Sequence, residues 1–291
     1  MKQLTRRWQL IRSAGKGMLL LYVFLTLLAV FMMLPIVFIF NHAFKPLHEL
    51  FLFPPTFLVR QPTVRNFEQL LLSASSDMVP FSRYLLNSIL AAAATVISVI
   101  LISSMAAYAL AKRSFPFKAA IMALIMVSLM FAAETVAIPR YLIVSFLGVT
   151  DTYFALILPL LASPVAVFLL IQFMGQIPNE LLEAAQLDGA REFQIFMRLV
   201  MPLAMPAVTT VAIITFQAAW GDVEGSTLFI HKEQLKTLPY YVTTLITGMA
   251  NSVAGQNIAA AAGLLMFLPT FLMFILFQSK VNETMVHSGV K

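Results

Sequence analysis

Six long apolar runs without Asp, Glu, Lys or Arg, bounded by charged residues, constrain what this chain can fold into. The runs cover residues 17–44, 84–111, 119–139 (broken only by Glu134), 152–179, 199–221 and 237–279. A helix needs about 20 residues to cross a hydrocarbon core of about 30 Å, so each run can hold one span. The last run is long enough for two, but its first half is rich in Thr, Gly, Asn, Ser and Gln. We therefore predict six spans, at about 17–40, 85–111, 119–139, 153–174, 203–220 and 258–278.

The composition points to the same class of protein. Hydrophobic residues make up 60% of the chain and charged residues 11%, whereas soluble domains average about 25% charged residues. The first run is longer than the apolar core of a signal peptide and has no small-residue cleavage site after it, so we expect it to be a retained span. The chain has no cysteine, which excludes disulfides, thiolate chemistry and Cys-based metal sites.

Basic residues predict the orientation. The tail 1–16 holds Lys2, Arg6, Arg7, Arg12 and Lys16 without an acidic residue, so we place it in the cytoplasm, against anionic lipid. Six spans then place the tail 280–291 and the loops around 112–118 and 178–200 inside as well. The inside segments carry 12 basic and 5 acidic residues, and the outside segments 7 and 8. We interpret the pI of about 9.7 as a topology signal and expect no nucleic-acid partner.

One polar segment, residues 178–206, interrupts the apolar pattern. Pro178 ends the fourth span, and Asn179 is the expected N-cap of a short helix with Glu180 and Glu183 in its first turns. Gly189 stands where that helix should end, because glycine adopts the left-handed C′ conformation without steric cost. A second helix over 191–200 should lead to Pro202 and Pro206, which open the fifth span.

The spacing of this segment resembles the "EAA" coupling loop of ABC-importer permeases. Glu183-Ala184-Ala185, three residues, Gly189, nine residues and then apolar-x-apolar-Pro202 match the pattern of that loop. Further residues resemble the carbohydrate branch, specifically the maltose-type second permease: Asp188, Ala190, Phe196, Pro206, Asn87-Ser88, residues 104–111, residues 138–141, Thr215-Phe216 and Trp220-Gly221-Asp222. The family often has Trp-Asn-Asp at the last position. The resemblance covers about residues 18–291.

This resemblance implies an all-α, polytopic protein with six transmembrane helices and the type I ABC importer permease fold. Such a permease forms a heterodimer with a second permease, binds two ATPase subunits, and receives a sugar from an extracytoplasmic solute-binding protein. The residues implied in ATPase coupling, within a loop at 178–202, are Glu183, Ala184, Ala185, Asp188, Gly189, Ala190 and Pro202. The chain has no Gly-x-x-x-x-Gly-Lys-Ser/Thr motif, so ATP and Mg belong to the partner ATPase, and the chain itself is not an enzyme and binds no cofactor. The implied location is a bacterial or archaeal cytoplasmic (inner) membrane.

Polar and aromatic residues within or near the spans are the candidates for the substrate pathway. They are Glu134, Tyr141, Gln172, Gln217 and Trp220. Packing or an aromatic belt at the membrane surface is the alternative role for each of them. Two other functions stay open: an ABC permease for a non-sugar solute, and an ion-coupled secondary transporter. The second would be expected to show buried ionisable residues and an inverted repeat, which this sequence does not. A metal site is not expected, because the four histidines are scattered.

Overall fold

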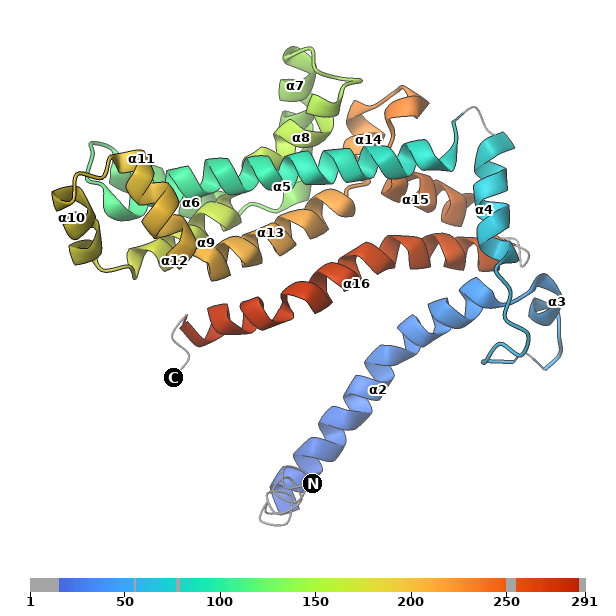
Figure 1. The fold of residues 1–291 in the computed structure, drawn as a ribbon. Helices are drawn as coiled ribbons and strands as arrows, with labels where there is room; N and C mark the ends of the chain where they lie inside the picture. Colours follow the sequence, from blue (N-terminus) through green and yellow to red (C-terminus); the bar gives the residue numbers. More distant parts are fainter. Residues whose placement is uncertain (1–15, 55, 77–78, 250–254, 288–291) are drawn as a thin grey trace. The chain divides into compact units, whose positions relative to one another are not determined.

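The computed structural model describes residues 16–54, 56–76, 79–249 and 255–287, and within these ranges the regular elements are all helices (Figure 1). The chain forms two compact units. One unit comprises Met1–Leu70 with Met249–Leu264, and the other Leu71–Gly248 with Leu265–Lys291.

The first unit contains α2 (Lys16–Phe44), α3 (Leu47–Leu50), and the beginnings of α4 (Arg65–Ser76) and α16 (Gln256–His287). Apolar side chains are exposed along the length of α2, as expected of a helix surrounded by lipid. Buried polar groups hold the residues after α2. Asn66 donates to the carbonyls of Ala43 and Lys45 at 2.8 and 2.9 Å, and Asn257 donates to Asn66 Oδ1 at 2.8 Å.

The second unit is built around α5 (Phe81–Lys112), which packs against α8 (Tyr153–Leu161), α9 (Pro164–Gly175) and α13 (Met205–Trp220) (Figure 1). Small residues make this packing possible, since they let helix backbones approach closely. Ala91, Ala92, Ser103, Ser104 and Ala107 of α5 are all buried. The small-residue surface of α5 therefore packs within the subunit.

The amino-terminal end of α5 is joined to the segment before α15 (Leu238–Met249) by hydrogen bonds. Asn87, which is fully buried, donates to the carbonyls of Gln234 and Lys236 at 2.9 and 2.8 Å and accepts from Tyr153 Oη at 2.7 Å. Ser88 Oγ accepts from the Leu238 N–H at 2.7 Å. The remaining short elements of the unit are α6 (Lys118–Ser128), η1 (Ala133–Val136), α7 (Ala137–Phe146), α10 (Asn179–Leu187), α11 (Glu192–Ile195), the π-helix η2 (Phe196–Val200), α12 (Met201–Leu203), α14 (Glu224–Phe229) and η3 (Glu233–Leu235).

Continuous helices account for only some of the predicted spans. In the described residues three helical stretches are long and apolar enough to cross a membrane: Gly17–Phe44, Phe81–Lys112 and Gln256–Gln278. The number rises to five if each of two bent helix pairs is counted as one span. The pair α8–α9 bends by 45°, and the pair formed by Glu192–Leu203 and α13 bends by 79°. The first bend has a local cause, because Pro164 holds Ser163 in an extended conformation and begins α9.

The prediction of one continuous helix over 119–139 is wrong. α6 ends at Ser128, and the chain turns before η1 and α7 begin. Pro139 lies in the first turn of α7, where its missing N–H costs nothing. The third apolar run is therefore divided into two helical parts.

Candidate functional site

The polar segment 178–206 folds as a short helix followed by a bent one. α10 begins at Asn179, after Pro178 in an extended conformation, and no side chain caps its first N–H groups. The expected N-cap role of Asn179 is thus wrong. Its Oδ1 instead accepts a hydrogen bond from Lys112 Nζ at 3.1 Å. In α11, Gln194 Oε1 accepts from the Arg191 N–H at 2.9 Å, which fixes the entry to the second helix.

Gly189 ends α10 in the predicted left-handed conformation, with a φ of 80°. Two hydrogen bonds form a Schellman motif there. The Ala190 N–H donates to the Ala185 carbonyl, and the Gly189 N–H donates to the Gln186 carbonyl, both at 3.0 Å. These bonds pair carbonyls of the last turn of α10 and so end the helix.

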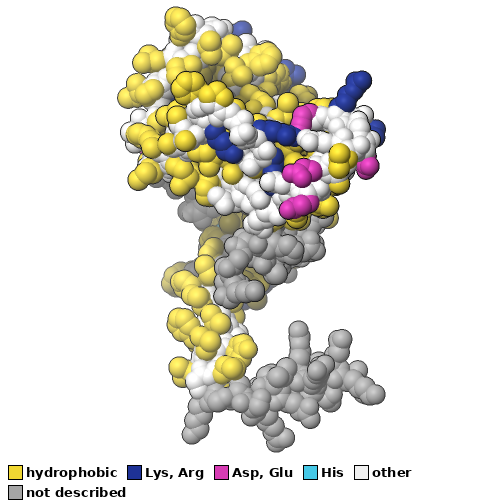
Figure 2. Space-filling model, turned by 90° about the vertical axis from the view of Figure 1, so that its left-hand side faces the viewer, with side chains coloured by type: hydrophobic (Ala, Val, Ile, Leu, Met, Phe, Trp, Pro, Cys, Tyr) yellow, Lys and Arg dark blue, Asp and Glu magenta, His cyan; other side chains and the backbone are white. Residues whose placement is uncertain are grey.

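The end of α10 is exposed. Glu183, Ala184, Asp188 and Gly189 lie on its surface, and the Leu187 side chain is 89% exposed. On the opposite face, Leu182 is buried, and Ala185 and Ala190 pack against the core of the second unit. Pro202 lies further along the chain and is exposed. Figure 2 shows this end of the unit, where acidic and basic side chains gather among hydrophobic ones.

Three side chains at the carboxyl end of α5 hold this segment. Lys112 Nζ donates to the carbonyls of Gly175, at 3.3 Å, and Ile177. Tyr108 Oη donates to Glu192 Oε1 at 3.1 Å. Arg113 forms an ion pair with Glu192 and donates to Tyr108 Oη at 3.2 Å. The loop is thus fastened to α5 both before and after α10. These contacts join residues far apart in the chain, so the sequence motif did not reveal them.

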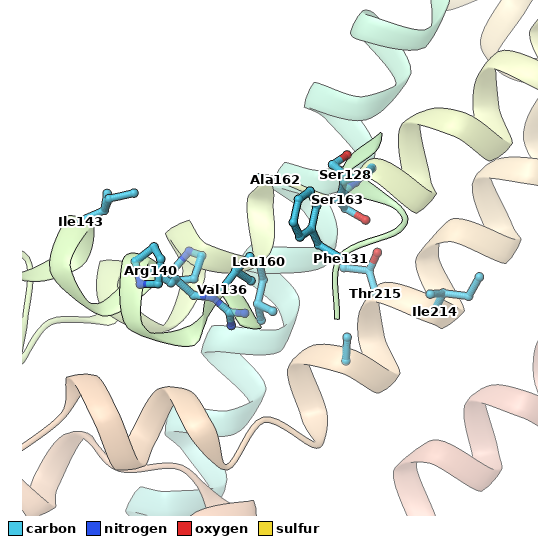
Figure 3. A pocket seen from close by; sticks show the side chains of 14 residues that line it. Ser128, Phe131, Val136, Arg140, Ile143, Leu160, Ala162, Ser163, Ile214 and Thr215 are labelled. Atoms are coloured by element: carbon cyan, nitrogen blue, oxygen red, sulfur yellow. The ribbon is translucent and has the colours of Figure 1, made fainter. Parts of the chain in front are cut away.

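A cavity of about 660 Å³ lies in the second unit, between the end of α6, α7, the α8–α9 bend and α13. Its lining is mostly apolar but includes the hydroxyl groups of Ser128, Ser163 and Thr215 and the guanidinium of Arg140. In Figure 3, Arg140 lies toward one end of the cavity and Ser128 and Ser163 toward the other. Such a mixture of apolar surface and a few polar groups is typical of a small-molecule site.

None of the five residues predicted for the substrate pathway lines this cavity. Glu134, Tyr141, Gln172 and Gln217 are exposed on the unit's surface. Trp220 is buried, and its Nε1–H donates to the Met266 carbonyl of α16 at 3.0 Å. Two lining residues are sequence neighbours of predicted residues, because Arg140 precedes Tyr141 and Ala218 follows Gln217. The missed signal was the pair Pro159 and Pro164, which marks a broken helix.

An acidic turn follows α13, at the position where the sequence departs from the Trp-Asn-Asp pattern. Asp222 Oδ1 accepts from the Gly225 N–H at 2.9 Å, and burial raises the pKa of the Asp222 carboxyl. Arg140 Nη1 lies 3.8 Å from Glu224 Oε1. The φ of Gly221 is −93°, so its backbone conformation does not require glycine, but a Cβ there would lie 3.2 Å from the Gln217 carbonyl oxygen. No group of three or more His, Asp or Glu side chains that could hold a metal ion occurs in the part of the chain that the structure describes.

The chain is similar to known transport proteins along most of its length. Residues 99–286 match the family model described as binding-protein-dependent transport system inner membrane component. The chain is 30% identical to a putative ABC transporter permease of Caldicellulosiruptor sp. (strain Rt8B.4), over 93% of this chain and 96% of that protein. It is 30% identical to the sulfoquinovosyl glycerol transport system permease of Agrobacterium fabrum (96% of each chain) and 29% identical to the trehalose transport system permease of Mycobacterium tuberculosis (91% of this chain and 95% of that protein).

Solved structures share the fold. A chain of a bacterial ABC transporter involved in the import of the acidic polysaccharide alginate superposes with a TM-score of 0.79 at 20% identity, covering 90% of this chain and 95% of that one. A chain of a bacterial alginate ABC transporter in complex with an alginate pentasaccharide-bound periplasmic protein superposes with a TM-score of 0.56 at 15% identity, over 97% of each chain. The match to the family model and the identity to full-length relatives agree with the helical fold. The chain belongs to the family of binding-protein-dependent transport system inner membrane components.

Proposed function

We propose that this chain is one of two permease subunits of an ATP-driven importer for a carbohydrate. It pairs with a second permease, takes up a sugar delivered by an extracytoplasmic solute-binding protein, and docks on an ATPase through the loop 178–202. Both termini lie in the cytoplasm. ATP and Mg bind to the ATPase, and this chain transmits the resulting movement.

The geometry of α10 carries this proposal. A short helix that exposes Leu187 at 89% beside Ala184 and Asp188 presents apolar and acidic surface to a partner. An isolated Leu on a surface is common, but here it stands at the tip of a helix whose other face is anchored in the core. A protein cleft is a suitable partner because a small side chain such as Ala184 permits close approach.

The solute class rests on the relatives and on the cavity. Relatives are named for transport of trehalose, arabinooligosaccharides and sulfoquinovosyl glycerol. The cavity offers hydroxyl groups from Ser128, Ser163 and Thr215, and the ring of Phe131. Hydroxyl and aromatic groups suit a sugar, which needs hydrogen bonds and an apolar face. One relative is named for sn-glycerol-3-phosphate transport and is 32% identical over 70% of this chain. A non-sugar solute is therefore the alternative to a sugar.

The test is purification of the tagged chain from its native membranes in a mild detergent, with mass spectrometry of the proteins that accompany it. We expect an ATPase, a second permease and a solute-binding protein. The solute released from the binding protein by denaturation then identifies the cargo. A phosphorylated, non-sugar solute would retain the importer and overturn the carbohydrate assignment.

Two glycine variants make the test specific. Gly189 and Gly148 both have a positive φ, of 80° and 66°, with open space around them. Only Gly189 belongs to the loop 178–202. We expect Gly189→Trp to lose the ATPase and keep the second permease, and Gly148→Trp to keep both. Recovery of the chain alone, with transport that survives ATP depletion, would refute the importer.

A further inference from the structure

The carboxyl end of α5 contacts the chain at two places, one before and one after the exposed end of α10. Lys112 binds the end of α9 and the first residue of α10 through the carbonyls of Gly175 and Ile177 and through Asn179 Oδ1. Tyr108 and Arg113 bind Glu192, which begins α11. The exposed residues Glu183, Ala184 and Asp188 take no part in these contacts.

Aromatic packing stiffens the second attachment. The rings of Tyr108 and Phe196 lie 5.4 Å apart, and Phe196 is buried. The Arg113 guanidinium carbon lies 5.8 Å from the centre of the Tyr108 ring. Tyr108 therefore holds Arg113 and Glu192 in place from its own fixed position on α5.

We propose that Tyr108, Lys112 and Arg113, together called the α5 clamp, make α5 move as one body with the loop 178–202. The clamp rests on the proposed docking function and names the residues that transmit its movement. Two attachments matter because a single one would let the loop rotate about it. With both in place, a push on the tip of α10 displaces α5 itself.

The ion pair has a transmitting role rather than a large role in folding. The side chains of Arg113 and Glu192 are 39% and 50% exposed, and exposed ion pairs contribute little to stability. Variants of this pair should therefore fold. Their effect should appear when the loop is loaded by the ATPase.

The chain has no cysteine, so spin labels can be placed at chosen positions. We would label Leu90 on α5 and Phe193 on α11, whose side chains are 48% and 64% exposed. The distance between the labels is then measured in the complete importer without nucleotide and with Mg-ATP and vanadate. The clamp predicts one distance in both states. In a chain carrying Lys112→Met and Arg113→Gln the distance should shift between the states and its distribution should broaden.

Hydrolysis of ATP provides the functional readout. The measured quantity is the factor by which the binding protein, purified from the same cells, stimulates ATP hydrolysis by the importer. We expect Arg113→Gln and Glu192→Gln each to lower this factor by at least about fivefold, which is the lower end of typical coupling between sites. The double variant should be no worse than either single one. The exchange Arg113→Glu with Glu192→Arg should restore most of the stimulation. Arg65→Gln removes an exposed charge outside the loop 178–202 and should have no effect.

Three results would overturn the clamp and leave the importer in place. One is a distance between the labels that changes equally in the parent and in the variant. The others are losses of stimulated hydrolysis that multiply in the double variant, and release of the ATPase by Arg113→Gln. Tyr108→Phe keeps the ring against Phe196 and removes only the hydroxyl, so it tests the same contact without a change of packing. If no ATPase accompanies the parent chain, the proposed function fails. The distribution of distances between the two spin labels, measured without nucleotide, still tests the clamp. The clamp predicts a narrow distribution in the parent and a broad one in the variant.

Discussion

Replacing single glycines with alanine tests whether ATPase binding depends on the conformation of the turn that ends α10. Gly189 is in that turn, and Gly148 and Gly175 serve as controls. A Cβ at Gly189, Gly148 or Gly175 meets no atom within 4 Å, so substitution by alanine causes no steric clash with the surroundings. Only the backbone conformation differs. Gly189 and Gly148 have positive φ, whereas Gly175 lies in the last turn of α9.

The expected free energies follow from that difference. An L-residue other than glycine in the left-handed region costs about 1–2 kcal/mol, and Asn costs less. In a helix, replacing Gly with Ala contributes roughly 0.5–1 kcal/mol of stability. If the ATPase binds only the Schellman conformation of the loop, Gly189→Ala weakens binding by about five- to thirtyfold. Gly189→Asn should be intermediate.

The assay is binding of the purified ATPase to the chain in lipid nanodiscs, together with thermal unfolding of each variant. Gly148→Ala carries the same strain at a turn outside the loop, so it should lower stability and leave ATPase affinity unchanged. Gly175→Ala should bind normally. Equal affinities of the Gly189→Ala and Gly175→Ala variants would refute the reasoning, as would an equal loss in Gly148→Ala.

Three further predictions concern stability in detergent. Asn87→Ala removes the Asn87 partner of the Lys236 carbonyl and of the Tyr153 hydroxyl, while the Gln234 carbonyl keeps the hydrogen bond from Arg83 Nε. It should lower the free energy of unfolding by about 3 kcal/mol. Ser103→Ala on the same helix removes a buried hydroxyl without a partner and should cost nothing in thermal unfolding. Hydrogen bonds from the Lys232 N–H, and then from the His231 N–H, lower the pKa of the Asp151 carboxyl in the folded protein. The ionised carboxylate therefore stabilises the fold above its unfolded pKa of about 3.9, and this stabilisation is lost as the pH falls toward the lower folded pKa. Asp151→Asn should flatten the decrease in stability at acid pH. Trp220→Phe keeps the ring stacked near Phe216 and loses the hydrogen bond to the Met266 carbonyl, which should cost about 1 kcal/mol. A purely structural role predicts unchanged solute transport, and a selective loss of transport would support the predicted place of Trp220 in the substrate pathway.

Local chemistry explains what the sequence could predict. The left-handed Gly189 and the uninterrupted α5 depend on residues within one or two turns, so the pattern of residue types was enough. The break at Ser128 was missed because Glu134 and Pro139 lie within an otherwise apolar run, and length alone suggested one helix. α6 in fact ends at Ser128, and η1 begins at Ala133, before Pro139 is reached.

Long-range contacts explain what the sequence could not predict. The bond between Tyr108 and Glu192 joins residues 84 positions apart, and no periodicity identifies such a pair. The cavity was missed for a related reason. Its polar groups come from Ser128, Arg140, Ser163 and Thr215, on four separate stretches of helix and turn, and no local pattern in the sequence brings these stretches together.

Polar groups at both ends of α5 determine how this helix can move. Its middle packs closely through small residues, which form no side-chain hydrogen bonds to the neighbouring helices among those described. Asn87 at one end and Lys112 and Arg113 at the other each have several partners. Sliding by one turn, about 5.4 Å, would break both sets of hydrogen bonds at once. Axial sliding of α5 is therefore the costly movement, and tilting together with the loop 178–202 and the segment before α15 is the movement that keeps every bond.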